Sequence, residues 1–122
     1  MTIIMLPVFP GLRFYLYSEP TDMRKSFDGL SGIIKNERLG NPVSGDVFIF
    51  VNRRRDRIKF LVWDRSGFWL FYKRLEKGTF QILPGPMENS SMELTYDVLL
   101  MLVEGIDYTR IKRRPRYHSQ SV

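Results

Sequence analysis

The spacing of hydrophobic residues changes several times along the chain, and each change predicts a new element. Residues 12–18, LRFYLYS, are rich in aromatic and other strand-forming residues, which predicts a β-strand. Residues 21–40 then follow helical spacing, with apolar side chains that share one face: Met23, Phe27, Leu30 and Ile34. Thr21 or Asp22 is expected to cap the start of this helix, and Gly40 to end it.

Three strands are predicted in the middle of the chain, at residues 47–51, 57–63 and 68–74. The links between them have hairpin length, so an antiparallel meander is the simplest connection. Alternation divides the apolar side chains of the second strand between two faces: Ile58, Phe60 and Val62 on one, Leu61 and Trp63 on the other. Other elements must therefore cover both faces, or one face is an interaction site.

The rest of the chain predicts a fourth strand, a loop and a second helix. Residues 79–83 extend the meander, and residues 84–90, PGPMENS, form a loop. The next residues, SSMELTYDVLLMLVEGID, predict a helix in which Ser90 and Glu93 have capping-box spacing, followed by a broad apolar stripe. The segment 110–122 is too polar and basic to join a core.

These elements define an α+β fold: a single domain with an antiparallel β-meander of about four to five strands packed with two helices. A chain of 122 residues is long enough to bury a core without disulfides or metal. We expect this domain to span residues 1–109, followed by a basic, flexible C-terminal tail over residues 110–122.

Charge is sorted along the sequence. Residues 51–77 carry nine Lys and Arg against three Asp and Glu, and residues 108–122 carry five basic residues and no acidic ones. Residues 78–107 carry five acidic residues and no basic ones. Together with the net charge of +6, this segregation predicts a local cationic surface for a polyanion.

Composition excludes several other classes. The 43% hydrophobic and 26% charged residues are typical of a globular protein. The absence of cysteine rules out disulfides and gives no support for secretion. The apolar N-terminal run is broken by Pro7 and Pro10 and is too short to cross a membrane, so we expect a cytoplasmic protein without a membrane partner.

Catalytic chemistry finds little support. The single histidine, His118, lies in the basic tail, where its ring cannot be held against a nucleophile. Asp22 and Asp64 are explained by helix capping and turn formation, and the sequence contains no glycine-rich phosphate loop or paired metal-binding histidines. We therefore expect no enzyme activity and no cofactor or metal.

Nucleic-acid binding is better supported. Long cationic side chains at a hairpin tip and in a flexible arm can both reach phosphates. The candidate contacts are Arg53, Arg54, Arg55, Arg57 and Lys59 at the tip, and Arg110, Lys112, Arg113, Arg114 and Arg116 in the tail. The ordinary explanation is that hairpin turns need polar residues and that a basic tail aids solubility. For the tip alone the two interpretations are balanced, and the charge sorting favours binding.

The aromatic residues of 63–72 have two interpretations as well. They can stack on unpaired bases, but a run of this kind in a strand is more often core. Trp69 and Phe71 stay open, because alternation places them on the face opposite Phe68 and Leu70.

Three segments resemble a known family: TDMRKSFDGL (21–30), IKFLVWDRSGFWLFYKRLEKGTF (58–80) and LLMLVEGIDY (99–108). They are similar, in order and spacing, to the signature blocks of the TnpB accessory proteins encoded by the second reading frame of IS66-type bacterial insertion sequences. The resemblance implies a protein that assists transposition while a separate transposase performs the strand chemistry. The residues that match the motifs, without assigned roles, are Arg24, Lys25, Trp63, Asp64, Lys73, Arg74, Glu76, Glu104 and Asp107.

The leading hypothesis is a non-catalytic accessory protein of transposition that binds DNA through the hairpin tip and the tail. The alternative is an adaptor for the element's transposase, using the acidic second helix or an uncovered apolar sheet face. A metal-dependent nuclease is a third, weaker hypothesis.

Overall fold

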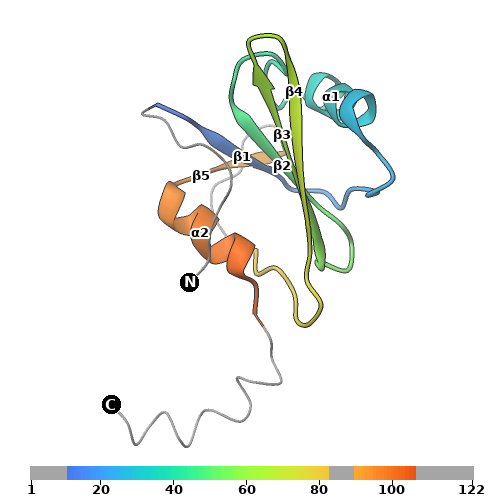
Figure 1. Ribbon diagram of the computed structural model, residues 1–122, viewed down its shortest axis with the longest axis vertical. Helices are drawn as coiled ribbons and strands as arrows, with labels where there is room; N and C mark the ends of the chain where they lie inside the picture. Colours follow the sequence, from blue (N-terminus) through green and yellow to red (C-terminus); the bar gives the residue numbers. More distant parts are fainter. Residues whose placement is uncertain (1–10, 83–89, 107–122) are drawn as a thin grey trace, which may run out of the picture.

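A five-stranded sheet lies at the centre of the fold, with one helix packed against each face (Figure 1). The computed structural model describes residues 11–82 and 90–106. In chain order the elements are β1 (Phe14–Tyr17), α1 (Phe27–Asn36), β2 (Val47–Val51), β3 (Arg57–Asp64), β4 (Gly67–Arg74), β5 (Ser91–Leu94) and α2 (Tyr96–Glu104). The predicted α+β fold is confirmed.

The strand order in the sheet is β4-β3-β2-β1-β5. β2, β3 and β4 form the expected antiparallel meander, joined by short hairpin turns. β1 departs from the meander because it pairs parallel with β2, and a parallel neighbour requires a crossover, which α1 provides. β5 returns from the far end of the sequence and pairs antiparallel with β1 at the opposite edge from β4.

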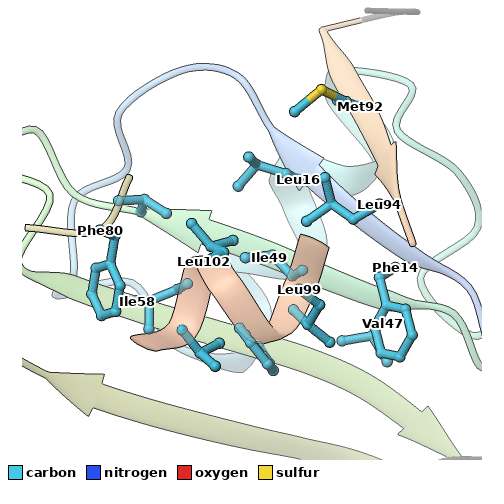
Figure 2. Close-up of a cluster of buried hydrophobic side chains, with 13 residues drawn as sticks. Phe14, Leu16, Val47, Ile49, Ile58, Phe80, Met92, Leu94, Leu99 and Leu102 are labelled. Carbon is cyan, nitrogen blue, oxygen red and sulfur yellow. The ribbon is translucent and has the colours of Figure 1, made fainter. Parts of the chain in front are cut away.

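Two hydrophobic cores sit on the two faces of the sheet. The larger lies under α2, where Leu99, Leu102 and Val103 pack on the strands (Figure 2). The smaller lies under α1, whose Leu30 and Ile34 pack on the other face. β2 is buried along its whole length because both helices cover it, and this explains its uninterrupted apolar sequence.

The predicted alternation in β3 is confirmed. Ile58 and Phe60 belong to the core under α2, with Val62 packed at its margin, while Leu61 belongs to the core under α1. Trp63, on the α1 face, contacts a neighbouring aromatic ring in β4 at a centroid distance of 5.0 Å. Both faces of the strand are therefore covered by helices, the first of the two options left open by the sequence.

The first helix is shorter than predicted. α1 begins after Ser26, so neither Thr21 nor Asp22 is its N-cap, and it ends at Asn36 rather than at Gly40. The segment ahead of it forms turns against the sheet, with the Thr21 amide donating to the Val51 carbonyl at 2.9 Å. Helical spacing of apolar residues extended the prediction too far, because a turn that packs on the same core also needs apolar contacts.

The predictions for the C-terminal third also need correction. Residues 79–82 form no strand, and Thr79 makes only an isolated bridge with Ile106. The predicted capping box is wrong because Glu93 lies in β5, and α2 is capped instead by Thr95, whose hydroxyl accepts from an amide of the first turn. The loop residues 84–89, the tail 110–122 and the N-terminal residues 1–10 lie outside the described residues.

Candidate nucleic-acid interface

The turn between β2 and β3 carries the arginine run, and a single asparagine side chain organises it. The Asn52 amide nitrogen donates to the Asp56 carboxylate at 2.7 Å, and its carbonyl oxygen accepts from the amides of Asp56 and Arg57, each at 3.0 Å. The backbone amide of Arg55 closes the turn by donating to the backbone carbonyl of Asn52 at 3.0 Å. Hydrogen bonds within the turn therefore fix its backbone, and the side chains of Arg53, Arg54 and Arg55 project into solvent.

The segment after β4 supports this turn from behind. The Leu75 amide donates to the Asp56 carbonyl at 2.8 Å, and the Phe80 amide donates to the Arg55 carbonyl at 2.7 Å. Phe80 is itself 1% exposed in the core under α2. The tip is thus anchored to the folded body, which lowers the entropy lost when its side chains contact a ligand.

The motif residues ahead of α1 lie beside the tip. Lys59 in β3 is 5% exposed, and its ammonium donates to the carbonyl oxygens of Met23 and Lys25, both at 2.7 Å. The same ammonium lies 4.6 Å from the centroid of the Tyr72 ring in β4. Lys59 therefore fastens the 23–25 turn to the sheet, next to the hairpin tip.

A pocket of about 640 Å³ forms where the β2–β3 tip, the 23–25 turn and β4 meet. Four arginines and two aspartates contribute to its wall, so its charged lining is net positive. The residues around it are Pro20, Thr21, Asp22, Met23, Arg24, Asn52, Arg53, Arg54, Asp56, Arg57 and Tyr72.

Two polar contacts set the electrostatics of the pocket. Asp22 accepts from the Arg24 guanidinium at 2.6 Å, and this bond lowers the pKa of the Asp22 carboxyl to about 2. Arg57 donates to the Tyr72 hydroxyl at 3.1 Å, which raises the pKa of the Arg57 guanidinium. Asp22 partly neutralises Arg24, whereas Arg57 is oriented by the Tyr72 hydroxyl and forms no ion pair within the described residues.

The structure separates the five predicted tip contacts. Arg53, Arg54 and Arg57 line the pocket, and Arg55 is exposed on the same turn with a positive φ of 60°. The ammonium of Lys59 is turned inward, so we leave it out of the contact surface and assign it the fastening described above. The tail candidates, Arg110, Lys112, Arg113, Arg114 and Arg116, lie outside the described residues.

The motif residues divide into surface and structural positions. Arg24 lines the pocket, with Lys25 exposed beside it. The others make contacts within the fold: Trp63 packs on Phe68, Asp64 accepts from the Trp69 indole at 2.8 Å, Lys73 donates to the Val103 carbonyl at 2.6 Å, and Arg74 pairs with Glu76 at 2.9 Å. Lys73 thus satisfies a carbonyl in the last turn of α2. Glu104 lies in that same turn, and Asp107 is outside the described residues.

Sequence reasoning missed Asn52 as a member of the site. Asn52 had a local signal, since asparagine at the start of a polar hairpin turn commonly bonds the backbone that follows. Tyr72 was considered only as one of the aromatic residues of 63–72, because its place opposite Lys59 depends on the strand register. Trp69 is 57% exposed, while Phe71 packs at the margin of the core under α2.

Two further findings concern the described residues alone. In residues 11–82 and 90–106 no group of three or more His, Cys, Asp or Glu side chains is arranged to hold a metal ion. Neither α1 nor α2 is long and apolar enough to cross a membrane.

Comparison with known proteins identifies the family. Residues 12–113 match the family described as IS66 Orf2 like protein. Uncharacterized protein y4jC of Sinorhizobium fredii (strain NBRC 101917 / NGR234) is 37% identical over 105 residues, which cover 86% of this chain and 88% of the relative. Uncharacterized protein y4hO of the same strain is 32% identical over 104 residues, covering 85% and 89%. No solved structure gives a significant match.

The chain therefore belongs to the IS66 Orf2 like family, and the resemblance noted in the sequence is confirmed. Membership in this family points to an accessory role in transposition.

Proposed function

We propose that this protein is a non-catalytic, DNA-binding accessory factor of transposition that holds the phosphate backbone in the pocket at the β2–β3 tip. The observation that carries the proposal is the convergence of Arg24, Arg53, Arg54 and Arg57 around one hollow. These arginines come from two segments that are about thirty residues apart in sequence, and the fold orders both through hydrogen bonds to the sheet.

Charge and geometry both favour phosphate as the ligand. Guanidinium groups bind phosphate oxygens through paired N–H donors, and each phosphate neutralised by a protein cation releases condensed counterions from the DNA. The exposed side chains of Arg53 and Arg54 gain most from this exchange because no ion pair in the described residues engages them. We expect the basic tail to add contacts of the same kind along the backbone.

The test is the salt dependence of binding to duplex from the element ends, measured by fluorescence anisotropy. A double Arg53→Ala, Arg54→Ala variant is expected to reduce the log–log slope by about 1.8, at about 0.9 per phosphate contact. The matched control is Lys35→Glu, which changes the net charge by the same amount at the other end of α1. An unchanged slope in the double variant, or an equal loss in the control, would remove the tip from the interface.

An adaptor role is the second candidate, and the outer face of α2 favours it. Met101 is 55% exposed there, and helical spacing places Asp97 and Glu104 on the same face. An acidic surface with an apolar anchor is suited to a basic protein such as a transposase rather than to DNA. Co-purification with the element's transposase after nuclease digestion separates the candidates, since an adaptor complex survives digestion and a DNA bridge does not.

A further inference from the structure

The outer edge of β4 is long and apolar, and no element of the described residues pairs with it. In the part of the chain that the structure describes, β4 pairs only with β3, and its eight residues stand at the edge of the sheet. Trp69 is 57% exposed and Tyr72 is 50% exposed. Proteins usually protect such edges with an inward charge, a proline or a bulge, and the sequence from Gly67 to Tyr72 has no charge and no proline.

We infer that β4 pairs antiparallel with β4 of a second copy of this chain, so that two sheets join across a twofold axis at Leu70. A twofold axis perpendicular to the sheet keeps each face on its own side, so opposed residues must be both even or both odd in number. Every register centred on a residue of β4 satisfies this condition, so the side chains must select among them. The register centred on Leu70 pairs Gly67 through Lys73 with their counterparts.

Side-chain complementarity selects this register. It sets Trp69 against Phe71 of the second copy on the α2 face, and Phe68 against Tyr72 of the second copy on the α1 face. Trp69 and Phe71 already stack within one chain, at a centroid distance of 6.3 Å, so four aromatic rings would meet beside the axis. Aromatic cross-strand pairs are among the most favourable in antiparallel sheets.

The charges at the ends of β4 fit the same arrangement. Lys73 is set against Gly67, so no two cations are opposed within the paired strands. Arg74, the last residue of β4, is set against Ser66 of the second copy. Asp64 and Glu76 would be opposed beyond the ends of the strand, where Glu76 is already paired with Arg74 of its own chain at 2.9 Å. A register centred one residue further along would instead set Trp69 against Lys73 and Phe68 against Arg74.

The first experiment is sedimentation velocity of the full chain without DNA, across micromolar to millimolar concentrations. We expect the mass to rise with concentration from the 14.5 kDa monomer to twice that value. Trp69→Lys places two cations diagonally across the axis and should weaken dimerisation by about tenfold or more. The control is Met101→Lys, at a similarly exposed apolar residue on α2. A monomer at every concentration, or equal effects of the two variants, would overturn the inference.

The second experiment tests the register and stays informative if Trp69→Lys folds poorly. Because the chain has no cysteine, single thiols can be introduced as Trp69→Cys and Phe71→Cys. Directly opposed Cβ atoms lie about 4.5–5.5 Å apart, and diagonal ones about 7–8 Å apart. Oxidised glutathione should therefore produce mainly the mixed disulfide from an equimolar mixture, identified by mass. Predominant homodisulfides, or crosslinking no faster than for Met101→Cys, would refute this register.

The dimer has a geometric consequence that rests on the proposed function. Both pockets fall on the α1 face of the joined sheet, since Lys59 and Tyr72 point to that side. Arg57 pairs with Arg74, four residues from the axis, so strand dimensions place the two Arg57 residues about 30 Å apart. That spacing is close to one turn of duplex DNA, about 34 Å. If the unmodified chain dimerises but does not bind DNA, the proposed function is rejected and the dimer is not.

Discussion

Replacement of Lys59 by methionine tests whether a buried ammonium holds the 23–25 turn against the β2–β3 tip. Methionine keeps an unbranched apolar stem of similar length and removes only the charged end. The ammonium makes two hydrogen bonds of 2.7 Å, to the carbonyls of Met23 and Lys25, and lies 4.6 Å from the Tyr72 ring centroid. All three contacts disappear together in the variant.

The expected loss of stability follows from opposing contributions. Two hydrogen bonds from a charged donor contribute about 3–6 kcal/mol together, and the ring contact up to about 2 kcal/mol. Removal of the buried charge offsets part of this loss, because the folded chain no longer bears the several kcal/mol that desolvation of the ammonium costs. The two carbonyls also lie in a turn near solvent, where water can replace the ammonium. We therefore expect the free energy of unfolding to fall by about 1–3 kcal/mol.

Urea unfolding followed by tryptophan fluorescence measures this change, with the m-value expected to stay constant. Hydrogen exchange should show faster exchange of the amides of 21–25, because their anchor is lost. DNA affinity should fall as well, since Arg24 is no longer held beside the tip. The control is Lys25→Met, which removes an exposed lysine and keeps the backbone carbonyl.

The reasoning would be refuted if Lys59→Met unfolded within about 0.5 kcal/mol of the parent chain, the usual range for surface substitutions, with unchanged exchange in 21–25. It would also fail if Lys25→Met had an equal effect, because the loss would then reflect charge alone.

Other predictions address the remaining contacts. Asp22→Asn should release Arg24 and steepen the salt dependence of DNA binding by about 0.9. The pKa of Asp22 is lowered from its usual 3.8 to about 2, so its ion pair is fully formed above pH 3.8 and is lost as the pH falls through about 2, which carboxyl titration by NMR checks. Thr95→Ala should cost about 1 kcal/mol of thermal stability by removing the α2 cap, and Thr95→Asp should retain it. Gly105→Ala should destabilise the fold by about 1–2 kcal/mol, because φ is +74° and the new Cβ would meet a leucine methyl at 2.7 Å. Gly32→Ala should stabilise the fold by about 0.5–1 kcal/mol, because the new Cβ would point into open space beside α1.

Local patterns in the sequence determined the elements whose contacts are close in the chain. The strands 47–51, 57–63 and 68–74 were placed within about one residue, because alternation and short polar turns together specify an antiparallel hairpin. The exposed arginines of the tip followed from the same reasoning, since strands with apolar residues on both faces leave the turn between them as the main polar segment. The family was also readable from the sequence, because its motifs extend over these local elements.

The tertiary structure alone decided which distant segments meet. Residues 91–94 resembled the start of a helix, yet they form β5 because the free edge of β1 offers a full set of hydrogen-bond partners. Lys59 resembled another surface cation, yet it is buried because the 23–25 turn crosses over it. The pocket needs both the local turn that exposes Arg53 and Arg54 and the contact between distant segments that brings the 23–25 turn beside it. Periodicity reports only which face of an element is apolar, whereas pairing partners and register are set by contacts between residues far apart in the chain.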